Sequence, residues 1–222
     1  MTSVHTTTRA AVRTLVRQRT DLVNSNQVSD SELNSWITQS LAWMHDLLVG
    51  VDSEYLVSKT TITLTGTESY SVPSDFYKAK LVEFSFGNGR YRKIERLKMD
   101  ERDRYADPFT WYPQLPQAGN PAGYDIVAGL IYFFPEQATG PVRLWYYPSA
   151  PQPADDSETF DVLNGFDESI VADVALKIAE KLGGDTGVWE RRKADAEQRV
   201  KAMGQERDVG GSWGMTLLPR GR

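Results

Sequence analysis

The sequence predicts an α+β fold in which helices from both ends of the chain form a helical bundle and a small antiparallel β domain is inserted between them. Apolar residues recur with the period of a helix near both ends of the chain and with a period of two between them. Helical stripes must be buried, so the two helical ends are expected to meet. The predicted parts are residues 1–52 and 165–207 for the bundle, 53–164 for the β domain, and 208–222 for an extended tail.

A first amphipathic helix is predicted from Thr8 to Val23. Its apolar stripe consists of Val12, Leu15, Val16, Leu22 and Val23. Arg9, Arg13 and Arg17 fall four residues apart on a neighbouring ridge, which we call the basic ridge. Such a ridge is usually a solvated face. The functional alternative is a surface that docks on an acidic partner or faces DNA.

A second helix is predicted to begin at a capping box formed by Ser29 and Glu32. Its apolar stripe comprises Leu33, Trp36, Ile37, Ser40, Leu41, Met44, Leu47 and Leu48, with Trp43 at the margin. One core does not easily absorb so wide a face. Trp36 and Trp43 are therefore candidates for a contact between subunits, and the alternative is that both cap the core of the monomer.

The middle of the chain changes to the period of a strand. A threonine-rich run around Thr60–Leu64 is followed by LVEFSF and RYRKI, a hairpin whose turn contains Gly87, Asn88 and Gly89. The runs YDIVAG, LIYFFP and VRLWYYP indicate three further strands in a meander. Prolines and acidic residues between Pro148 and Asp161 indicate a linker back to the helices.

The last helical signal extends from Asp167 to Arg207. Its first part carries the stripe Ile170, Val171, Val174, Ala175, Ile178, Ala179 and Leu182. Gly183 and Gly184 are expected to end this helix, and Asp185 or Thr186 can cap the next one. The Gly-rich tail that follows contains apolar and basic side chains typical of a partner-binding segment, namely Trp213, Met215, Leu217, Leu218, Arg220 and Arg222.

The composition of the chain excludes several classes of protein. The chain has 222 residues, no cysteine and a formal net charge of −5, so we expect a folded protein without disulfides that is not a general nucleic-acid binder. No apolar run approaches the roughly 20 residues of a membrane span, and the start of the chain does not resemble a signal peptide. The sequence therefore favours a protein that contacts no membrane and stays inside the cell, or inside what that cell assembles.

The sequence offers little that could carry catalysis. His5 lies near the start and His45 is expected on the polar side of the second helix, and neither has a metal-ligand neighbour at a useful spacing. Nucleophile elbows and phosphate-binding glycine loops do not occur in the sequence. We therefore expect no catalytic residues, no metal and no cofactor. Four acidic residues could hold a hard cation, although a solvated linker is favoured: Asp155, Asp156, Glu158 and Asp161.

The order of several motifs resembles the head-to-tail adaptor (connector) proteins of tailed bacteriophages. VSDSELNSWITQSLAWM precedes a threonine-rich strand, and YSVPSDFYK resembles the Y-x-L-P-x-D-F element of that family, with Val72 in place of the usual Leu. GNPAGYDIV, LIYFFP and VRLWYYPSAPQ are similar to its G-x-P-x-x-Y loop and its I-x-L-x-P and L-x-Y-Y-x-x-P strands. FDESIVADVALKIAEKLG is similar in character to its final helix. The resemblance covers roughly residues 8 to 205.

The resemblance implies a structural, non-enzymatic protein made in the host cytoplasm and located in the virion neck, at the head-tail junction. It implies a dodecameric ring of this chain that binds the portal protein above and a tail or nozzle protein below, while DNA passes through the lumen without sequence specificity. An acidic balance fits a wall along which DNA slides. The tail from 208 to 222 is then expected to bind portal.

Three alternatives remain open from the sequence. The first is a neck or tail-completion protein placed one ring lower, which binds no portal. The second is a carbohydrate- or receptor-binding β module that uses some of its abundant aromatic residues. An enzyme is the weakest alternative, because it would need His45 or the acidic cluster around Asp155 to lie in a cleft.

Overall fold

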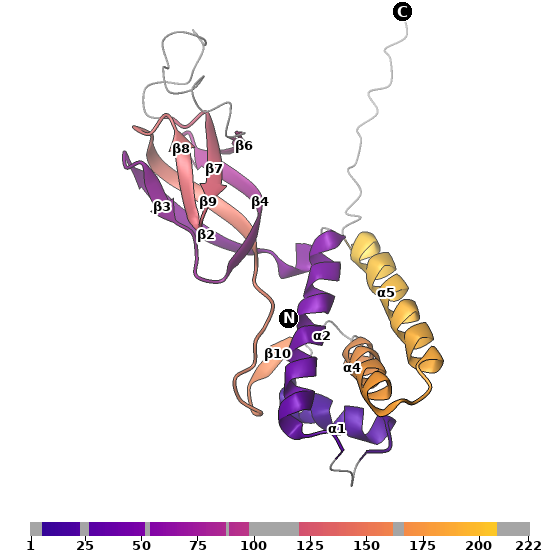
Figure 1. The fold of residues 1–222 in the computed structure, drawn as a ribbon. Coiled ribbons are helices and arrows are strands. Elements are labelled where there is room, and N and C mark those ends of the chain that lie inside the picture. The colour runs from indigo at the N-terminus through magenta and orange to yellow at the C-terminus, as the bar shows by residue number, and fades with distance from the viewer. Residues whose placement is uncertain are drawn as a thin grey trace, which may run out of the picture. The chain divides into compact units, whose positions relative to one another are not determined.

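The structure is a computed structural model, and it describes residues 6–22, 27–51, 54–87, 89–97, 120–161 and 167–207. The chain forms two compact units (Figure 1). The helical unit contains residues 1–54 and 150–222, and the β unit contains residues 55–149. The segment after 149 therefore belongs to the helical unit, whereas the sequence placed the end of the β domain at 164.

The helical unit brings together helices from both ends of the chain. Its helices are α1 (Arg9–Arg19), α2 (Asp30–Gly50), α4 (Asp167–Leu182) and α5 (Gly187–Arg207), and the short 3-10 helix η1 (Glu54–Leu56) follows α2. Helix α4 contacts α1, α2 and α5, and α5 also contacts α2 (Figure 1). The mixed α+β class follows the prediction, and helices from the two ends of the chain are in contact.

Local signals explain where these helices begin and end. Thr8 caps α1 by accepting a hydrogen bond from the Ala11 N–H at 3.1 Å. The predicted capping box of α2 is confirmed, since Ser29 and Glu32 each accept a hydrogen bond from the other's backbone N–H. Helix α4 ends at Gly183, whose φ of 68° is a conformation that favours glycine.

Helix α4 is the centre of the helical unit. Its apolar stripe was predicted, and all side chains from Ser169 to Leu176 are buried around the helix, including the polar Ser169 and Asp173; Leu182, the last residue of the predicted stripe, is instead 41% exposed. A helix that is buried on all sides is surrounded by other elements rather than laid on a surface. Val200 of α5 is also fully buried. Removing α4 would therefore leave α1, α2 and α5 without their common partner.

A small two-stranded sheet in the helical unit was not predicted. Strand β1 (Thr6–Thr8) pairs antiparallel with β10 (Thr159–Asp161), so that Thr7 lies opposite Phe160. Phe160 is buried. The two strands have three residues each and are separated by about 150 positions in the sequence. A local periodicity analysis does not detect such short and distant partners.

The β unit consists of two four-stranded sheets. The first has the order β2-β9-β4-β5 and the second has the order β3-β8-β7-β6. The strands are β2 (Ser58–Thr65), β3 (Ser69–Ser71), β4 (Phe76–Ser85), β5 (Tyr91–Lys93), β6 (Glu95–Arg96), β7 (Gly123–Val127), β8 (Leu130–Phe134) and β9 (Thr139–Pro148). All pairs are antiparallel except β6 with β7, which is parallel.

Both sheets contribute to one apolar core. Its members come from both sheets and include Val82, Phe84, Val142, Leu144 and Tyr146 of the first sheet, and Tyr124, Ile131 and Phe133 of the second. The predicted hairpin β4–β5 is present. The predicted meander is wrong in its last step, because β9 pairs with β2 and β4 and not with β8. Alternating residues can pair within one sheet or face each other across two, and the local pattern does not distinguish the two outcomes.

Candidate interaction site: the ionic networks of the helical unit

The basic ridge lies inside the helical unit rather than on its surface. The side chains of Arg9, Arg13 and Arg17 are only 13%, 16% and 19% exposed. They project from successive turns of α1, as their spacing predicted. The expectation of a solvated face is therefore wrong.

Arg9 binds the segment that returns from the β unit. Its Nη1 and Nη2 atoms donate to the backbone carbonyls of Pro153 at 2.7 Å and Ala154 at 2.9 Å. Its Nε atom lies 3.0 Å from Oδ1 of Asp156. One arginine thus satisfies two backbone carbonyls and one carboxylate of a proline-rich segment. We call residues 150–158 the return segment.

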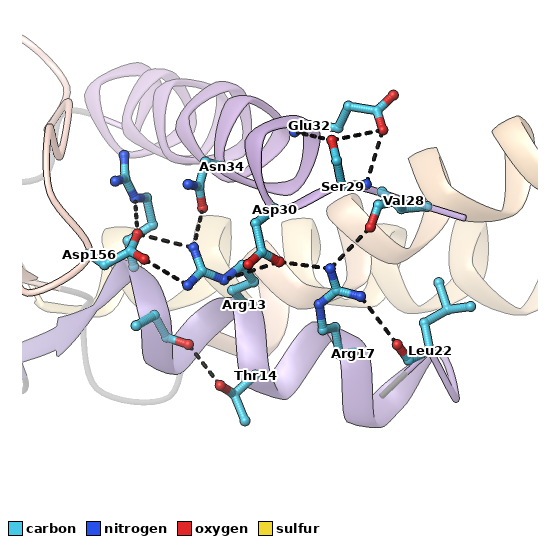
Figure 2. A network of polar contacts seen from close by, with 12 residues as sticks. Arg13, Thr14, Arg17, Leu22, Val28, Ser29, Asp30, Glu32, Asn34 and Asp156 are labelled. Atoms are coloured by element: carbon cyan, nitrogen blue, oxygen red, sulfur yellow. Dashed lines mark hydrogen bonds and ion pairs between the residues drawn. The ribbon is translucent and has the colours of Figure 1, made fainter. Parts of the chain in front are cut away.

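Arg13 occupies the centre of the network (Figure 2). Its Nη1 and Nη2 atoms donate to the two carboxylate oxygens of Asp156 at 3.0 and 2.7 Å, and Nη1 also donates to Asn34 Oδ1 at 2.9 Å. Asp30 lies 3.6 Å from Nε. The hydrogen bond to Asp156 raises the pKa of Arg13, and the same bond holds the pKa of Asp156 below its usual value.

Arg17 holds the connection between α1 and α2. It donates through Nη2 to Asp30 Oδ1 at 2.7 Å and to the Val28 carbonyl at 3.0 Å, and through Nη1 to the Leu22 carbonyl at 3.2 Å (Figure 2). Asp30 is the first residue of α2. The basic ridge therefore links α1 to α2 and to the return segment, and its donors are used within the chain.

The acidic cluster of the return segment is part of the same network. Asp156 binds two arginines, and Glu158 accepts a hydrogen bond from the Ala154 N–H at 2.8 Å. The carboxylate of Asp156 is therefore neither a free ligand nor simply a solvated linker charge. Among the described residues, no group of three or more His, Asp or Glu side chains is placed to hold a metal ion.

A second ionic cluster surrounds Asp173 of α4, which the sequence analysis missed. Its carboxylate is 4% exposed and lies 2.9 Å from Lys177 Nζ and 2.7 Å from Lys193 Nζ of α5. Ser40 of α2 donates its hydroxyl to the same carboxylate. Burial alone would raise the pKa of Asp173, but the hydrogen bonds from Lys193, Ser40 and Lys177 lower it below its usual value. The cluster joins three helices.

The two tryptophans proposed for subunit contacts are half-buried beside this cluster. Lys193 Nζ lies 4.9 Å from the ring centroid of Trp43, and Lys181 Nζ lies 5.9 Å from that of Trp36. Lys181 also pairs with Glu32 at 2.6 Å. Both rings thus contact lysines of their own chain, while part of each ring stays accessible to another molecule.

His45 is buried, with 5% of its surface exposed, so its predicted place on the polar side of α2 is wrong. The width of the apolar face of α2 explains the error, because α4 and α5 both pack against this helix. His45 Nδ1 lies 3.7 Å from Asp46 Oδ1. His5 lies outside the described residues, and so does the whole predicted portal-binding tail with Trp213, Met215, Leu217, Leu218, Arg220 and Arg222.

The aromatic residues of β8 and β9 do not form a stacking platform. Phe133, Phe134, Tyr146 and Tyr147 are buried. Trp145 is half-buried and donates its indole N–H to Glu83 at 2.8 Å. Most of the described aromatic residues of β8 and β9 are therefore buried, which counts against a carbohydrate-binding module built on these strands; Trp111 and Tyr112 lie outside the described residues.

Comparison with protein-family models gives a match that covers nearly the whole chain. The family model described as SU10 adaptor protein matches residues 7–220, which is nearly the whole chain. A search of curated proteins finds no match. In the part of the chain that the structure describes, no helix is both long enough and apolar enough to cross a membrane.

Proposed function

The chain belongs to the SU10 adaptor protein family, and from this membership we propose that it is a head-to-tail adaptor that joins the portal to the tail of a tailed bacteriophage. Members of this family are structural proteins rather than enzymes, and an adaptor of this kind belongs in the virion neck. The match along residues 7–220 is the observation that carries the proposal. It covers both units of the fold, so both take part in the adaptor.

We propose that copies of the chain form a ring beneath the portal, with a tail or nozzle protein below and DNA passing through the lumen. The formal net charge of −5 supports passage of DNA, because an acidic wall does not retain phosphates. The helices of the helical unit would supply the bundle of each copy. We propose twelve copies in the ring, which is the number that the resemblance to head-to-tail adaptors implies.

The tail from 208 to 222 is the proposed portal-binding element. Its sequence combines four large apolar side chains with two arginines and several glycines. A glycine-rich segment loses much backbone entropy when it becomes ordered, so one tail alone would bind weakly. Repetition around a ring would convert weak binding by single tails into a durable attachment.

Trp36 and Trp43 are the proposed contacts between neighbouring bundles. Their half-buried rings are large, rigid and partly accessible, as expected of residues at protein interfaces. Replacing Trp43 by Glu should reduce ring formation and leave the fold of the single copy intact. We do not extend the docking proposal to the basic ridge, because its guanidinium groups bind acceptors within the chain.

The proposal is tested by pull-down with the portal protein. The intact ring should retain portal, the isolated tail peptide should bind it poorly, and a chain lacking residues 210–222 should not bind it. A full-length chain in which Arg220 and Arg222 are changed to Gln is the matched control: it removes the two positive charges of the tail and keeps its apolar side chains. Attachment that survives the deletion would exclude the tail as the anchor, and failure of the intact chain to bind portal would favour a neck protein one ring lower.

A further inference from the structure

One sheet of the β unit carries a charge opposite to that of the whole chain. The four strands of the sheet β2-β9-β4-β5 contain one acidic residue, Glu83, and six basic residues: Lys59, Lys78, Lys80, Arg92, Lys93 and Arg143. These strands therefore have a formal net charge of +5, while the chain has −5. The excess of basic residues is thus concentrated in this one sheet.

Strand register places most of these cations on the face that points away from the apolar core. Trp145 lies opposite both Lys59 of β2 and Leu81 of β4. Glu83 lies opposite both Arg143 of β9 and Lys93 of β5. Directly opposite residues share a face, and the core residues Val142 and Leu144 alternate with them on the other face. We call this outer surface the sheet face.

The sheet face has an ordered centre and a charged rim. At the centre, the guanidinium of Arg143 lies 3.5 Å from the ring centroid of Tyr91, and Glu83 accepts a hydrogen bond from the indole of Trp145. Lys59 Nζ lies 5.3 Å from the Trp145 ring. Lys59, Lys78 and Lys93 at the rim are exposed, and Lys80 is half-buried. Half-buried Trp, Tyr and Arg surrounded by exposed charge are the composition of a protein-binding surface.

The helical unit carries the complementary charge. Its two segments contain 20 acidic and 14 basic residues, which gives a formal net charge of −6. The end of α4 and the start of α5, residues 180–190, combine exposed acidic residues with exposed apolar ones: Glu180, Asp185 and Glu190, with Leu182 at 41% and Val188 at 40% exposure. We call this segment the α4–α5 turn.

Basic residues near the α4–α5 turn contact groups of their own chain. Lys181 pairs with Glu32, and the guanidinium of Arg192 lies 4.8 Å from the ring centroid of Trp189. The turn therefore presents carboxylates around two apolar side chains. The sheet face presents lysines around two aromatic rings, so the two surfaces match in both charge and polarity.

We propose that the sheet face of one copy binds the α4–α5 turn of a second copy. Two different surfaces meet in such a contact, which makes it heterologous, and a heterologous contact closes into a ring when its rotation allows. The inference deepens the proposed ring and rests on it. It assigns the β unit a role in assembly, in addition to any contact made by Trp36 and Trp43.

The same face fits double-stranded DNA less well. A central carboxylate, Glu83, would face the phosphates, and the aromatic rings are covered by cations and not open for stacking. The net charge of the chain would also oppose approach to DNA. Binding of double-stranded DNA to the sheet face is therefore the alternative that the experiment below distinguishes.

The test uses charge reversal on each surface of the full-length chain. One variant carries Lys59→Glu, Lys78→Glu and Lys93→Glu on the sheet face, and the other carries Glu180→Lys and Glu190→Lys on the turn. Each variant alone should self-associate roughly tenfold more weakly than the wild type at low salt, because like charges then meet. The readout is particle mass against concentration. Unchanged circular dichroism and melting temperature show that both variants fold.

A mixture of the two variants tests whether the two surfaces contact each other. In the mixture, the reversed sheet face of one variant meets the reversed turn of the other, and the unaltered pair also remains. Association should therefore return to within about threefold of the wild type. The matched control Lys201→Glu makes the same substitution on an exposed part of α5 outside the contact and should assemble as the wild type does.

Each remaining outcome overturns the inference. If the wild type forms rings and the sheet-face variant forms them equally well, the contact is wrong while the proposed function stands. If both variants are weak and their mixture is not restored, the two surfaces do not meet. If only retention of double-stranded DNA is lost, the sheet face binds nucleic acid instead. If the wild type never self-associates, alone or with portal, the proposed ring fails as well.

Discussion

The helical unit and the β unit use charged residues in opposite ways. In the helical unit, arginines and lysines are drawn inward, where Arg13 binds Asp156 and Lys193 binds the buried Asp173. In the β unit, the shared core is apolar and aromatic, and the cations of the first sheet lie largely on its outer face. Substituting the paired charges Arg13 or Asp173 should therefore change stability, whereas substituting the cations on the outer face of the first sheet should change association.

The difference follows from the elements that each unit is built from. Helix α4 contacts three other helices, so a polar residue at one of its buried positions, such as Asp173, needs a partner in the interior. An antiparallel sheet buries one face and leaves the other to solvent or to a partner. The formal net charge of −5 for the whole chain therefore reflects the helical unit, at −6, and not the first sheet of the β unit, at +5.

The largest expected effect is that of ending the chain at Leu163. This truncation removes α4 and α5, and with them the most completely buried helix of the protein. The helical unit should lose its cooperative unfolding transition, because several buried side chains worth roughly 1.5–3 kcal/mol each lose their partners. Thermal melts followed at 222 nm provide the measurement. A truncated chain that still melts cooperatively, with its helical signal retained, would contradict the central role of α4.

The second effect in size is that of Asp173→Asn. Removing this buried carboxylate leaves Lys177 and Lys193 without their shared anion, which should lower the free energy of unfolding by about 3 kcal/mol. Glu83→Gln on the sheet face is the matched control and should cost less than about 1 kcal/mol, because the amide oxygen still accepts from Trp145. Denaturant unfolding of both variants gives the comparison. Equal losses would remove the distinction between the two units.

The pH dependence of the helical unit provides a related check. The pKa of Asp173 is lower in the folded chain than in the unfolded chain, so its ionised form stabilises the fold above the unfolded value, near pH 4. This contribution is lost as the pH falls through the folded pKa. The wild type should therefore lose stability below about pH 4, and Asp173→Asn should lose less over the same range. Parallel slopes would contradict the lowered pKa.

A smaller effect is expected for Arg13→Lys. Lysine keeps the charge but cannot bind both oxygens of Asp156 and Asn34 in one plane, so the variant should lose about 1–2 kcal/mol. Lys93→Ala is the control on the β unit, where both partners of the Lys93–Glu95 pair are mostly exposed, and should change stability by about 0.5 kcal/mol or less. Urea unfolding distinguishes the two. An Arg13→Lys variant as stable as the wild type would mean that the network adds little to stability.

The smallest expected effect concerns Tyr70 in the β unit. Burial opposes ionisation of its phenol, but hydrogen bonds from Thr67 and Thr65 prevail and lower the pKa of Tyr70 to about 8. Because the folded pKa is below the unfolded one, stability should rise slightly between pH 8 and 10. Absorbance at 295 nm should show one tyrosine that titrates early, and Tyr70→Phe should remove that step. An unchanged titration in the variant would exclude the assignment.

Sequence periodicity predicted the elements whose burial is set locally. The stripe of α4 as far as Ala179 and the Ser29–Glu32 capping box needed only neighbouring residues, and both are present, whereas Leu182 at the end of the predicted stripe is exposed. The pairing of β9 with β2 and β4 depends on the packing of two sheets, which alternation alone does not encode. The same limit applies to β1 and β10, whose partners are far apart in sequence.

The candidate sites illustrate a similar limit. The spacing of Arg9, Arg13 and Arg17 placed them correctly on one ridge, but their acceptors lie at Asp156 and at the start of α2. No local signal shows that a linker carboxylate returns to α1. Asp173 escaped notice because a single acid within an apolar stripe resembles a margin residue until its lysine partner on another helix is known.

The most direct test of the proposed adaptor function is imaging of particles assembled from the intact chain and the portal protein. We expect a closed ring of copies beneath the portal that is coaxial with it and leaves an open channel for DNA. The ring should disappear when residues 210–222 are deleted. Portal particles without added density, or with single copies at irregular positions, would contradict the proposal.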